Sequence, residues 1–172
     1  YVLLNALTYG MYHGIFLYGN ISHCLTSHFS FGSSVMRDVT KVYLGASALM
    51  SDGGLLGRVG TACVALSAHM HHIPVLVCCE SYKISNRVQL ESITGNELGN
   101  PSQVAFLSTD SHEEKDCKDC VLKDWLETDN LRLLNLLYDL TPSDFVSGIV
   151  TELGIIPPTS VAVLLREMNP QN

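Results

Sequence analysis

The chain has few basic residues: ten lysines and arginines stand against seventeen acids, which gives a net charge of −7 over 172 residues. Proteins that bind a nucleic-acid backbone neutralise its phosphates with clustered lysine and arginine side chains. The charge balance therefore argues against a nucleic-acid partner. The length suits one substantial hydrophobic core, so a single domain over residues 1–172 is expected.

Charged side chains are especially scarce in the first 58 residues, where only five occur. A monomer keeps its surface charged to stay soluble, so we expect another protein chain to cover part of this half, and a homodimer of the domain is one such arrangement. The alternative is a membrane span over the uncharged first 21 residues. Asn5, His13 and Asn20 interrupt that apolar run, so no membrane contact is expected.

The six cysteines lack the spacing of a disulfide scaffold. Cys63, Cys78 and Cys79 fall in apolar segments, where a thiol packs as a small hydrophobe. Cys117 and Cys120 form a Cys-x-x-Cys pair, but no second pair with zinc-finger spacing accompanies it. The pattern favours a reducing, cytoplasmic location, with no metal site and no cofactor.

Residues 42–80 have the pattern of a strand, a glycine-rich loop, a helix and a second strand. The apolar runs 42–45 and 75–79 predict buried strands, and residues 59–72 are good helix formers. His69, His71 and His72 lie at the end of this helix, where they complement its dipole without forming a metal-binding face. Such a unit implies parallel strands joined by a right-handed crossover. We predict an α/β domain with a Rossmann-like parallel sheet and helices on both faces.

The remaining segments are less regular. A helix is predicted over 3–11 and strands over 15–18, 131–137 and 161–165, while 21–25 and 35–39 are ambiguous around a loop at 30–34. Residues 98–129 are polar, and 110–129 hold eight acids and three lysines, that is −5 of the −7. We expect a mobile acidic insertion at about 100–129. Thr141 and Pro142 predict a helix start, with Gly154 as its C-cap.

The loop at 45–61 follows a strand and precedes a helix, which is where parallel α/β sheets bind ligands and where helix amides hold anions. Its glycine spacing matches neither the Walker pattern nor the dinucleotide fingerprint. The loop therefore either cradles a phosphate or forms a tight connection, with Asp52 explained by turn geometry, Asp144 by helix capping and Asp139 left unexplained. The candidate ligand residues are Gly45, Asp52, Gly53, Gly54, Arg58, Gly60, Thr61 and Asp139, and Gly57 is a further glycine of the loop.

Four segments, at residues 44–49, 58–61, 73–83 and 138–142, together resemble the regulatory alpha, beta and delta subunits of translation initiation factor 2B. Residues 96–98, 133–139 and 151–157 resemble the delta branch of that family more than the alpha or beta branches. The resemblance covers nearly the whole chain. It implies a Rossmann-like carboxyl-terminal domain, which the family shares with methylthioribose-phosphate and ribose-bisphosphate isomerases.

The same resemblance implies that the chain has no catalytic residue. Ser47 stands where the isomerases place a catalytic aspartate, and a serine cannot supply the proton transfer of an acid. Gly57 and Arg58 replace an Asn-Lys pair, whereas Gly60 and Thr61 are retained. The isomerases' catalytic cysteine belongs to a segment upstream of this chain.

The resemblance further implies a regulatory part of the guanine-nucleotide exchange factor for initiation factor 2. The expected partners are the alpha and beta subunits of that exchange factor and the phosphorylated alpha subunit of initiation factor 2. Two alternatives stay open. The chain could be a working sugar-phosphate isomerase, or a non-catalytic domain that binds a phosphorylated metabolite through Arg58 and the Gly60–Thr61 amides.

Overall fold

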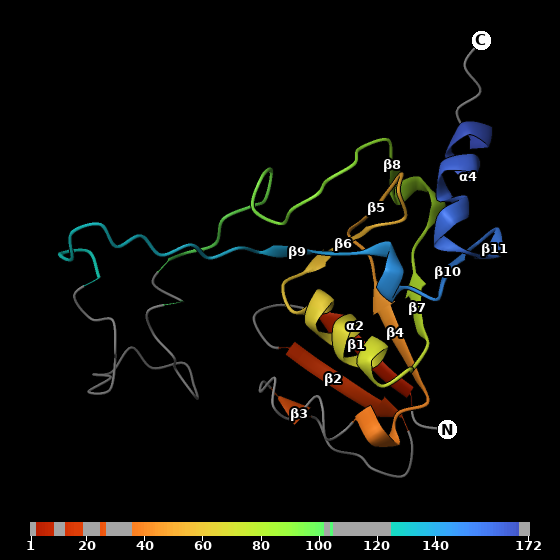
Figure 1. Cartoon of the computed structure of the whole chain (residues 1–172), viewed down its shortest axis with the longest axis horizontal. Helices are drawn as coiled ribbons and strands as arrows, with labels where there is room; N and C mark the ends of the chain where they lie inside the picture. The colour runs from red at the N-terminus through yellow and green to blue at the C-terminus, as the bar shows by residue number, and fades with distance from the viewer. Residues whose placement is uncertain are drawn as a thin grey trace. The chain divides into compact units, whose positions relative to one another are not determined.

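A computed structural model describes residues 3–8, 13–18, 25–26, 36–101, 104 and 125–168. The chain divides into two compact units, Tyr1–Ser92 with Tyr138–Asn172, and Ile93–Leu137. The helices α2 (Thr61–Met70) and α4 (Val161–Met168) and both sheets belong to the first unit (Figure 1). The single domain with an acidic insertion stays a prediction, and residues 105–124 of that insertion lie outside the described residues, as does the predicted loop at 30–34.

The larger sheet has parallel strands at its centre and antiparallel strands at both sides. Its parallel strands, in spatial order, are β10 (Gly148–Thr151), β7 (Val75–Cys78), β4 (Lys41–Gly45) and β1 (Leu3–Thr8). The antiparallel neighbours are β11 (Gly154–Ile156) beside β10, and β2 (His13–Tyr18) followed by β3 (Leu25–Thr26) beside β1. The α/β class and the strands predicted at 15–18, 42–45 and 75–79 are confirmed, although the sheet is mixed.

A second, four-stranded sheet was not predicted. Its strands, in spatial order, are β8 (Ile84–Ser85), β5 (Ala48–Met50), β6 (Leu55–Arg58) and β9 (Tyr138–Thr141). The β5–β6 hairpin falls inside the segment 45–61, which was predicted as a loop, so that prediction is wrong in part. β6 pairs antiparallel with β9, which places Gly57 directly opposite Asp139.

Helix α2 confirms the core of the helix predicted at 59–72. Thr61, Ala65 and Ala68 recur at helical spacing and are buried, and their small size lets α2 approach the strands closely. The helix ends in a Schellman motif, because His72 takes a left-handed conformation (φ 57°) and donates to the His69 carbonyl, while Ile73 donates to that of Ala68. No helix among the described residues is long and apolar enough to cross a membrane.

Two sequence predictions gave the wrong type of secondary structure, one a helix where a strand forms and the other a strand where a helix forms. Residues 3–8 form β1 instead of a helix, because they pair with β2 on one side and with β4 on the other, and this tertiary pairing outweighs the helical spacing of the leucines. Residues 161–168 form α4 instead of a strand. Val161 and Leu165, four residues apart, are its buried positions, and the turn η4 (Pro158–Ser160) leads into it.

The helix predicted from Thr141 to about Leu153 is also wrong. Only the 3₁₀ turn η3 (Ser143–Phe145) forms, and the chain then enters β10. There Ile149 pairs with Val77 of β7 on one side and with a residue of β11 on the other. Gly154 has a positive φ of 118°, but it lies in the β10–β11 hairpin and caps no helix. The ambiguous segment 35–39 contains the turn η1 (Met36–Asp38).

The strand predicted at 131–137 lies in the second unit and does not form. Among the described residues of this unit, Leu136 makes the one bridge, to Leu98, and the Leu137 N–H donates to the Glu97 carbonyl at 3.0 Å. The chain leaves the first unit after Ser92 and returns at Tyr138. The Ser92 hydroxyl oxygen accepts the backbone N–H of Leu140 at 3.1 Å, so the exit and return points are fastened together within the first unit.

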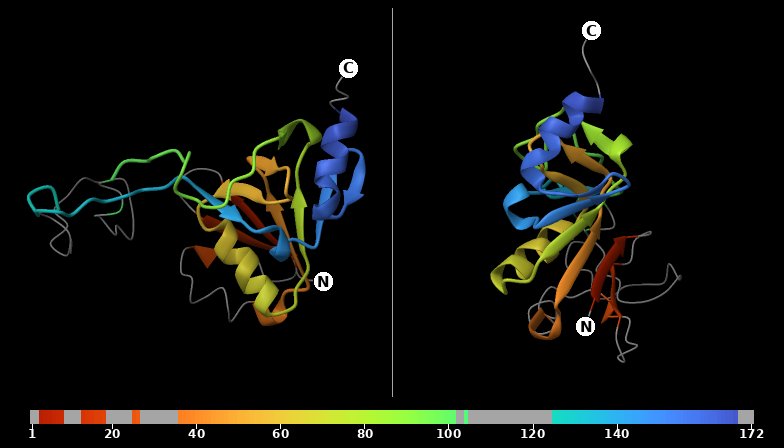
Figure 2. Two further views of the ribbon diagram at one scale, coloured as in Figure 1. Left: turned by 45° about the horizontal axis from the view of Figure 1, so that its top comes forward. Right: turned by 90° about the vertical axis from the view of Figure 1, so that its right-hand side faces the viewer.

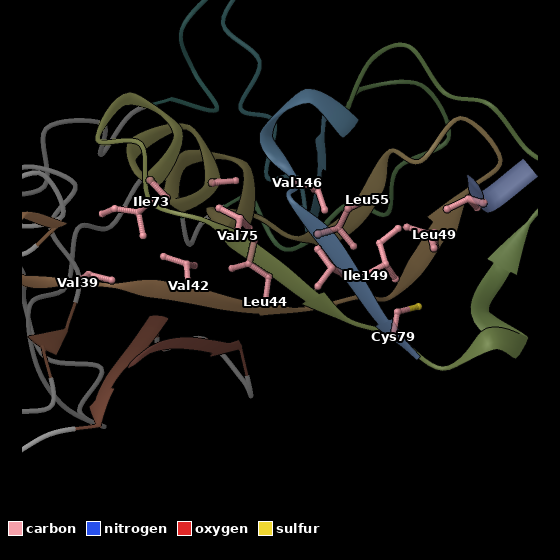
Figure 3. Close-up of a cluster of buried hydrophobic side chains, with 14 of the residues drawn as sticks. Val39, Val42, Leu44, Leu49, Leu55, Ile73, Val75, Cys79, Val146 and Ile149 are labelled. Atoms are coloured by element: carbon pink, nitrogen blue, oxygen red, sulfur yellow. The ribbon is translucent and has the colours of Figure 1, made fainter. Parts of the chain in front are cut away.

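The core of the first unit lies between the parallel strands on one side and α2 with the β5–β6 hairpin on the other (Figure 3). Val42, Val75 and Ile149 come from three adjacent strands and have no exposed surface. Leu49 and Leu55 of the hairpin are equally buried. Burying each such side chain contributes about 1.5–3 kcal/mol, so the hairpin is part of the packed structure and not a free loop.

Thr141 provides a test of this packing. Its side chain is fully buried, and its hydroxyl has no hydrogen-bond partner within the described part of the chain, so it does not act as the predicted helix cap. Thr141→Val keeps the shape and removes the unpaired hydroxyl, so the free energy of unfolding should rise by about 1 kcal/mol. Equilibrium denaturation in urea measures this change.

The matched control is Thr151→Val. The Thr151 hydroxyl donates to the Gly154 carbonyl (3.0 Å) and accepts the Leu153 N–H (3.1 Å), so this variant should be less stable than the parent. A loss of stability in Thr141→Val as well would contradict the prediction.

Candidate functional site

The start of helix α2 is held by a carboxylate from a distant strand. Asp139 Oδ2 accepts the backbone N–H of Gly60 at 2.7 Å and that of Ala62 at 3.0 Å. Gly60 is the N-cap and has a φ of 99°, a left-handed conformation that favours glycine. These are the amides that would hold a phosphate at this position, and a carboxylate of the chain itself takes two of them. The structure therefore gives a role to the acid that the sequence left unexplained.

Further contacts fasten the same corner. Thr61 is buried and its hydroxyl donates to the Arg58 carbonyl at 2.6 Å. The Arg58 guanidinium carbon lies 4.7 Å from the centre of the Tyr138 ring, a cation–π contact at the protein surface. A side chain at Gly57 would meet that of Thr61 at 2.9–3.0 Å, so glycine permits this close approach. Gly57, Arg58, Gly60, Thr61 and Asp139 thus form one group.

The turn residues of the candidate loop lie elsewhere. Asp52 Oδ1 accepts the Gly54 N–H at 2.9 Å, which confirms that Asp52 serves the turn. Gly53 has a φ of 83°, and a side chain there would come within 2.7 Å of the Pro158 carbonyl oxygen. Strand β6 separates this turn from Gly60 by about 13 Å, at roughly 3.3 Å per residue. The structure does not bring Asp52, Gly53 and Gly54 together with the start of α2.

The carboxyl ends of the parallel strands carry a cluster that the sequence did not predict. Gly45 pairs with Cys78 where β4 and β7 end, and Ser47 is exposed two residues later. The turn η2 (Ser81–Lys83) follows β7. The Lys83 ammonium nitrogen Nζ forms an ion pair with Glu80 Oε2 at 2.7 Å and donates a hydrogen bond to the Ala46 carbonyl oxygen at 3.3 Å. The cluster therefore fastens the end of β7 to the end of β4.

Glu152 completes this cluster from the end of β10. Both of its carboxylate oxygens accept the Ser81 N–H at 3.1 Å, and the Ser81 hydroxyl donates to Oε1. Residues 80–83 follow a predicted strand end and could have been identified from the sequence. Glu152 could not, because it was assigned to the last turn of a predicted helix. We name Glu80, Ser81, Lys83 and Glu152 the edge cluster.

Electrostatics keep the edge cluster ionised. Hydrogen bonding to Lys83 lowers the pKa of Glu80, and the same contact raises the pKa of Lys83. Hydrogen bonding to Ser81 lowers the pKa of Glu152. Two carboxylates thus accompany one ammonium near neutral pH, and their net charge disfavours an anionic ligand such as a sugar phosphate.

The thiols near these groups are poor nucleophiles. Burial raises the pKa of the Cys79 thiol to about 11, so it is protonated at neutral pH. Burial and the nearby Asp139 carboxylate raise the pKa of the exposed Cys63 thiol, and burial raises that of Cys78. None of these described thiols has the lowered pKa of an activated nucleophile.

Among the described residues, no group of three or more His, Cys, Asp or Glu side chains lies close enough together to hold a metal ion. The His69 ring lies against that of Phe145, with ring centres 5.0 Å apart, while His71 and His72 form the end of α2. Cys117 and Cys120 lie outside the described residues.

Comparison with known proteins identifies the family. A family model described as the initiation factor 2 subunit family matches residues 20–158. The chain belongs to the initiation factor 2 subunit family. It is 44% identical to translation initiation factor eIF2B subunit delta of Dictyostelium discoideum over 78% of this chain and 21% of that protein. The resemblance to delta-type members of the initiation factor 2 subunit family is thereby confirmed.

The relatives of the chain also include an isomerase. Ribose 1,5-bisphosphate isomerase of Pyrococcus furiosus is 31% identical over 77% of this chain and 36% of that enzyme. The chain thus spans between about a fifth and a little over a third of the length of these two relatives.

Solved structures show the same fold. The delta subunit of translation initiation factor eIF-2B from A. fulgidus superimposes with a TM-score of 0.60 at 23% identity, over 82% of this chain and 37% of that one. The tetrameric eIF2B-beta2-delta2 complex from C. thermophilum contains a chain that matches with a TM-score of 0.52 at 21% identity, over 78% and 33%. The fold predicted for a member of the initiation factor 2 subunit family is confirmed.

The two halves of the candidate loop respond differently to added side chains. Gly53→Ala should destabilise the protein by about 1–3 kcal/mol, because it combines a positive φ with a clash against the Pro158 backbone. Gly45→Ala is the matched control, since no atom lies within 4 Å of its added carbon. Thermal unfolding of both variants checks this. Equal effects would contradict the assignment of Gly53 to a packed turn.

The Asp139 cap can be followed through a nearby thiol. Asp139→Asn keeps an acceptor oxygen but removes the charge, so the variant should lose about 1 kcal/mol of stability. Removing the charge also lowers the pKa of Cys63, so alkylation of Cys63 at pH 8 should become faster.

Peptide mapping by mass spectrometry distinguishes Cys63 from the other cysteines. The pKa of Cys78 is raised by burial alone, so its alkylation rate should stay the same and serves as the internal control. An unchanged Cys63 rate together with unchanged stability would refute the capping role of Asp139.

Proposed function

We propose that this chain is a non-catalytic, regulatory part of a delta-type subunit of translation initiation factor 2B. It acts by assembling with the other subunits of that factor in the cytoplasm. The observation that carries this proposal is the occupation of the α2 amides by Asp139, at 2.7 and 3.0 Å, where a phosphorylated substrate would otherwise bind. Because these two amides already have a carboxylate partner, they are not free to hold a phosphate, which supports a protein-binding role over a substrate-binding one.

The edge cluster supports the same conclusion. In parallel α/β proteins the carboxyl ends of the strands are the usual substrate position. Here Lys83 and Glu152 are already engaged with Ala46 and Ser81 of the chain itself. Ser47, which the family resemblance aligns with the isomerase aspartate, carries no ionisable group for proton transfer.

Membership of the family suggests the partners that we propose. The C. thermophilum complex joins beta and delta subunits, and a chain of this fold is one component of it. We therefore propose the beta and alpha subunits of the exchange factor as direct partners. Sensing of the phosphorylated alpha subunit of initiation factor 2 is then a property of the whole assembly, with nucleotide exchange performed by other subunits.

Isomerase activity is the second candidate, and the 31% identity to ribose 1,5-bisphosphate isomerase favours it. A third possibility retains phosphate binding without chemistry, through the exposed Arg58, whose guanidinium lies over the Tyr138 ring. Both require an anion to approach Asp139 or the edge cluster, and the negative charge of these groups opposes that approach.

Co-expression with a beta subunit tests the proposal. The tagged chain should retain the beta subunit through affinity and size-exclusion chromatography. It should leave ribose 1,5-bisphosphate unchanged in a coupled assay, with the P. furiosus enzyme as positive control. A sugar phosphate should not raise the melting temperature of the chain or of its Arg58→Ala variant.

Each alternative predicts a different result. A chain that does not retain the beta subunit refutes the assembly proposal. Turnover of ribose 1,5-bisphosphate by the purified chain would establish the isomerase instead. Stabilisation by a sugar phosphate that disappears in Arg58→Ala would establish phosphate binding.

A further inference from the structure

The second unit, Ile93–Leu137, differs from the first in how its side chains are buried. Every side chain of the hydrophobic core belongs to the first unit, where Figure 2 shows α2 beside the parallel strands. None of the described residues of the second unit is buried. Leu98, Leu126 and Leu134 are 64%, 78% and 49% exposed. The described part of this unit therefore gains little stability from apolar burial, which is the main force that favours folding.

A short pairing of two segments holds the described part of the second unit together. The Gly99 N–H donates to the Asn135 carbonyl at 2.8 Å, and the Leu137 N–H donates to the Glu97 carbonyl at 3.0 Å. The Asn135 side-chain amide also donates to the Asn100 carbonyl at 2.9 Å. We name residues 97–100 together with residues 135–137 the neck.

Close packing at Gly99 shows that the neck is a formed structure. A side chain there would meet the Asn135 side-chain nitrogen at 2.7 Å and a methyl carbon of Leu137 at 2.9 Å. The neck is nevertheless small, with Leu98 opposite Leu136 as its bridge. An isolated pair of antiparallel segments is marginally stable in water, so the neck should open far more easily than a packed sheet.

The first unit is closed without the neck. Strand β9 begins at Tyr138 and pairs with β6, and the Leu140 N–H donates to the Ser92 hydroxyl oxygen at 3.1 Å. These contacts lie within the first unit and hold the chain at the two points where it leaves and returns. Opening the neck breaks none of them.

We propose that the second unit opens and closes as a separate cooperative unit, with the neck as its boundary, while the first unit stays folded. Proteins open in such units, and segments with few buried side chains and exposed hydrogen bonds open at the lowest free energy. The fold thus contains a built-in conformational device. A rearrangement of the second unit leaves the α/β core and the Asp139 contacts unchanged, whether or not the proposed function holds.

Hydrogen exchange of the unmodified chain tests the proposal on bonds of matched length. The Gly99 and Leu137 amides of the neck make bonds of 2.8 and 3.0 Å, and in the first unit Ser147 and Cys79 donate to neighbouring strands at 2.8 and 3.0 Å. After correction for intrinsic rates, the two neck amides should exchange at least about tenfold faster in NMR spectra, because they need only local opening. A smaller difference would overturn the proposal.

Two glycine substitutions provide a second test. A carbon added at Gly57, in β6, would lie 2.9 Å from the Thr61 hydroxyl oxygen, about as close as the contacts at Gly99. Gly57→Ala should lower the melting temperature by at least about 3 °C, because the strain falls within the packed first unit. Gly99→Ala should speed exchange of the Leu137 amide by at least about tenfold and shift the melting temperature by less than about 1 °C.

Other results with these variants would refute the separation. A fall in melting temperature for Gly99→Ala as large as that for Gly57→Ala would mean that the neck and the first unit unfold together. A Gly99→Ala chain that fails to fold would mean the same. Unchanged exchange of the Leu137 amide in Gly99→Ala would show that the neck is not the boundary. Loss of folding in Gly57→Ala, by contrast, fits the expected strain in the first unit.

Discussion

The hydrogen bonds from Gly60 and Ala62 to Asp139 are the interaction on which the rest of this structure depends. They join the first turn of α2 to β9 across 79 and 77 residues of sequence. The carboxylate complements the positive end of the helix dipole and satisfies amides that would otherwise lack partners. Because β9 pairs with β6, the same contact positions the hairpin sheet against the helix. A bound anion and the Asp139 carboxylate would compete for the same amides, and in this structure Asp139 occupies them.

The sequence predicted what local periodicity determines. The strands β4 and β7 and the helix between them follow from apolar runs ended by glycine and proline. The β5–β6 hairpin was missed because strands of only three and four residues, on either side of a glycine turn, do not differ in pattern from a loop. The strand that was predicted in place of α4 likewise reflects an uninformative local pattern. In residues 161–165 every position is apolar, so the pattern carries no period, and only Val161 and Leu165 prove to be buried.

The candidate site shows where sequence reasoning reaches its limit. Asp139 was recognised as unexplained, but its partners lie almost 80 residues earlier, and only the β6–β9 register brings them together. Glu152 was hidden because the helix assigned around Thr141 placed it in the wrong element. Both residues act across strand neighbours that tertiary pairing creates, and this information is absent from any local window of sequence.

The fastening of Ser92 to Leu140 has a consequence for how proteins of this kind vary in length. The polypeptide departs and returns at two points that one hydrogen bond of 3.1 Å connects. Residues added or removed between them leave that junction unchanged, and the entropic cost of a longer loop grows only slowly with its length. Residues 93–137 can therefore change in length or in charge while the α/β body keeps its geometry. We expect related proteins to differ in this stretch.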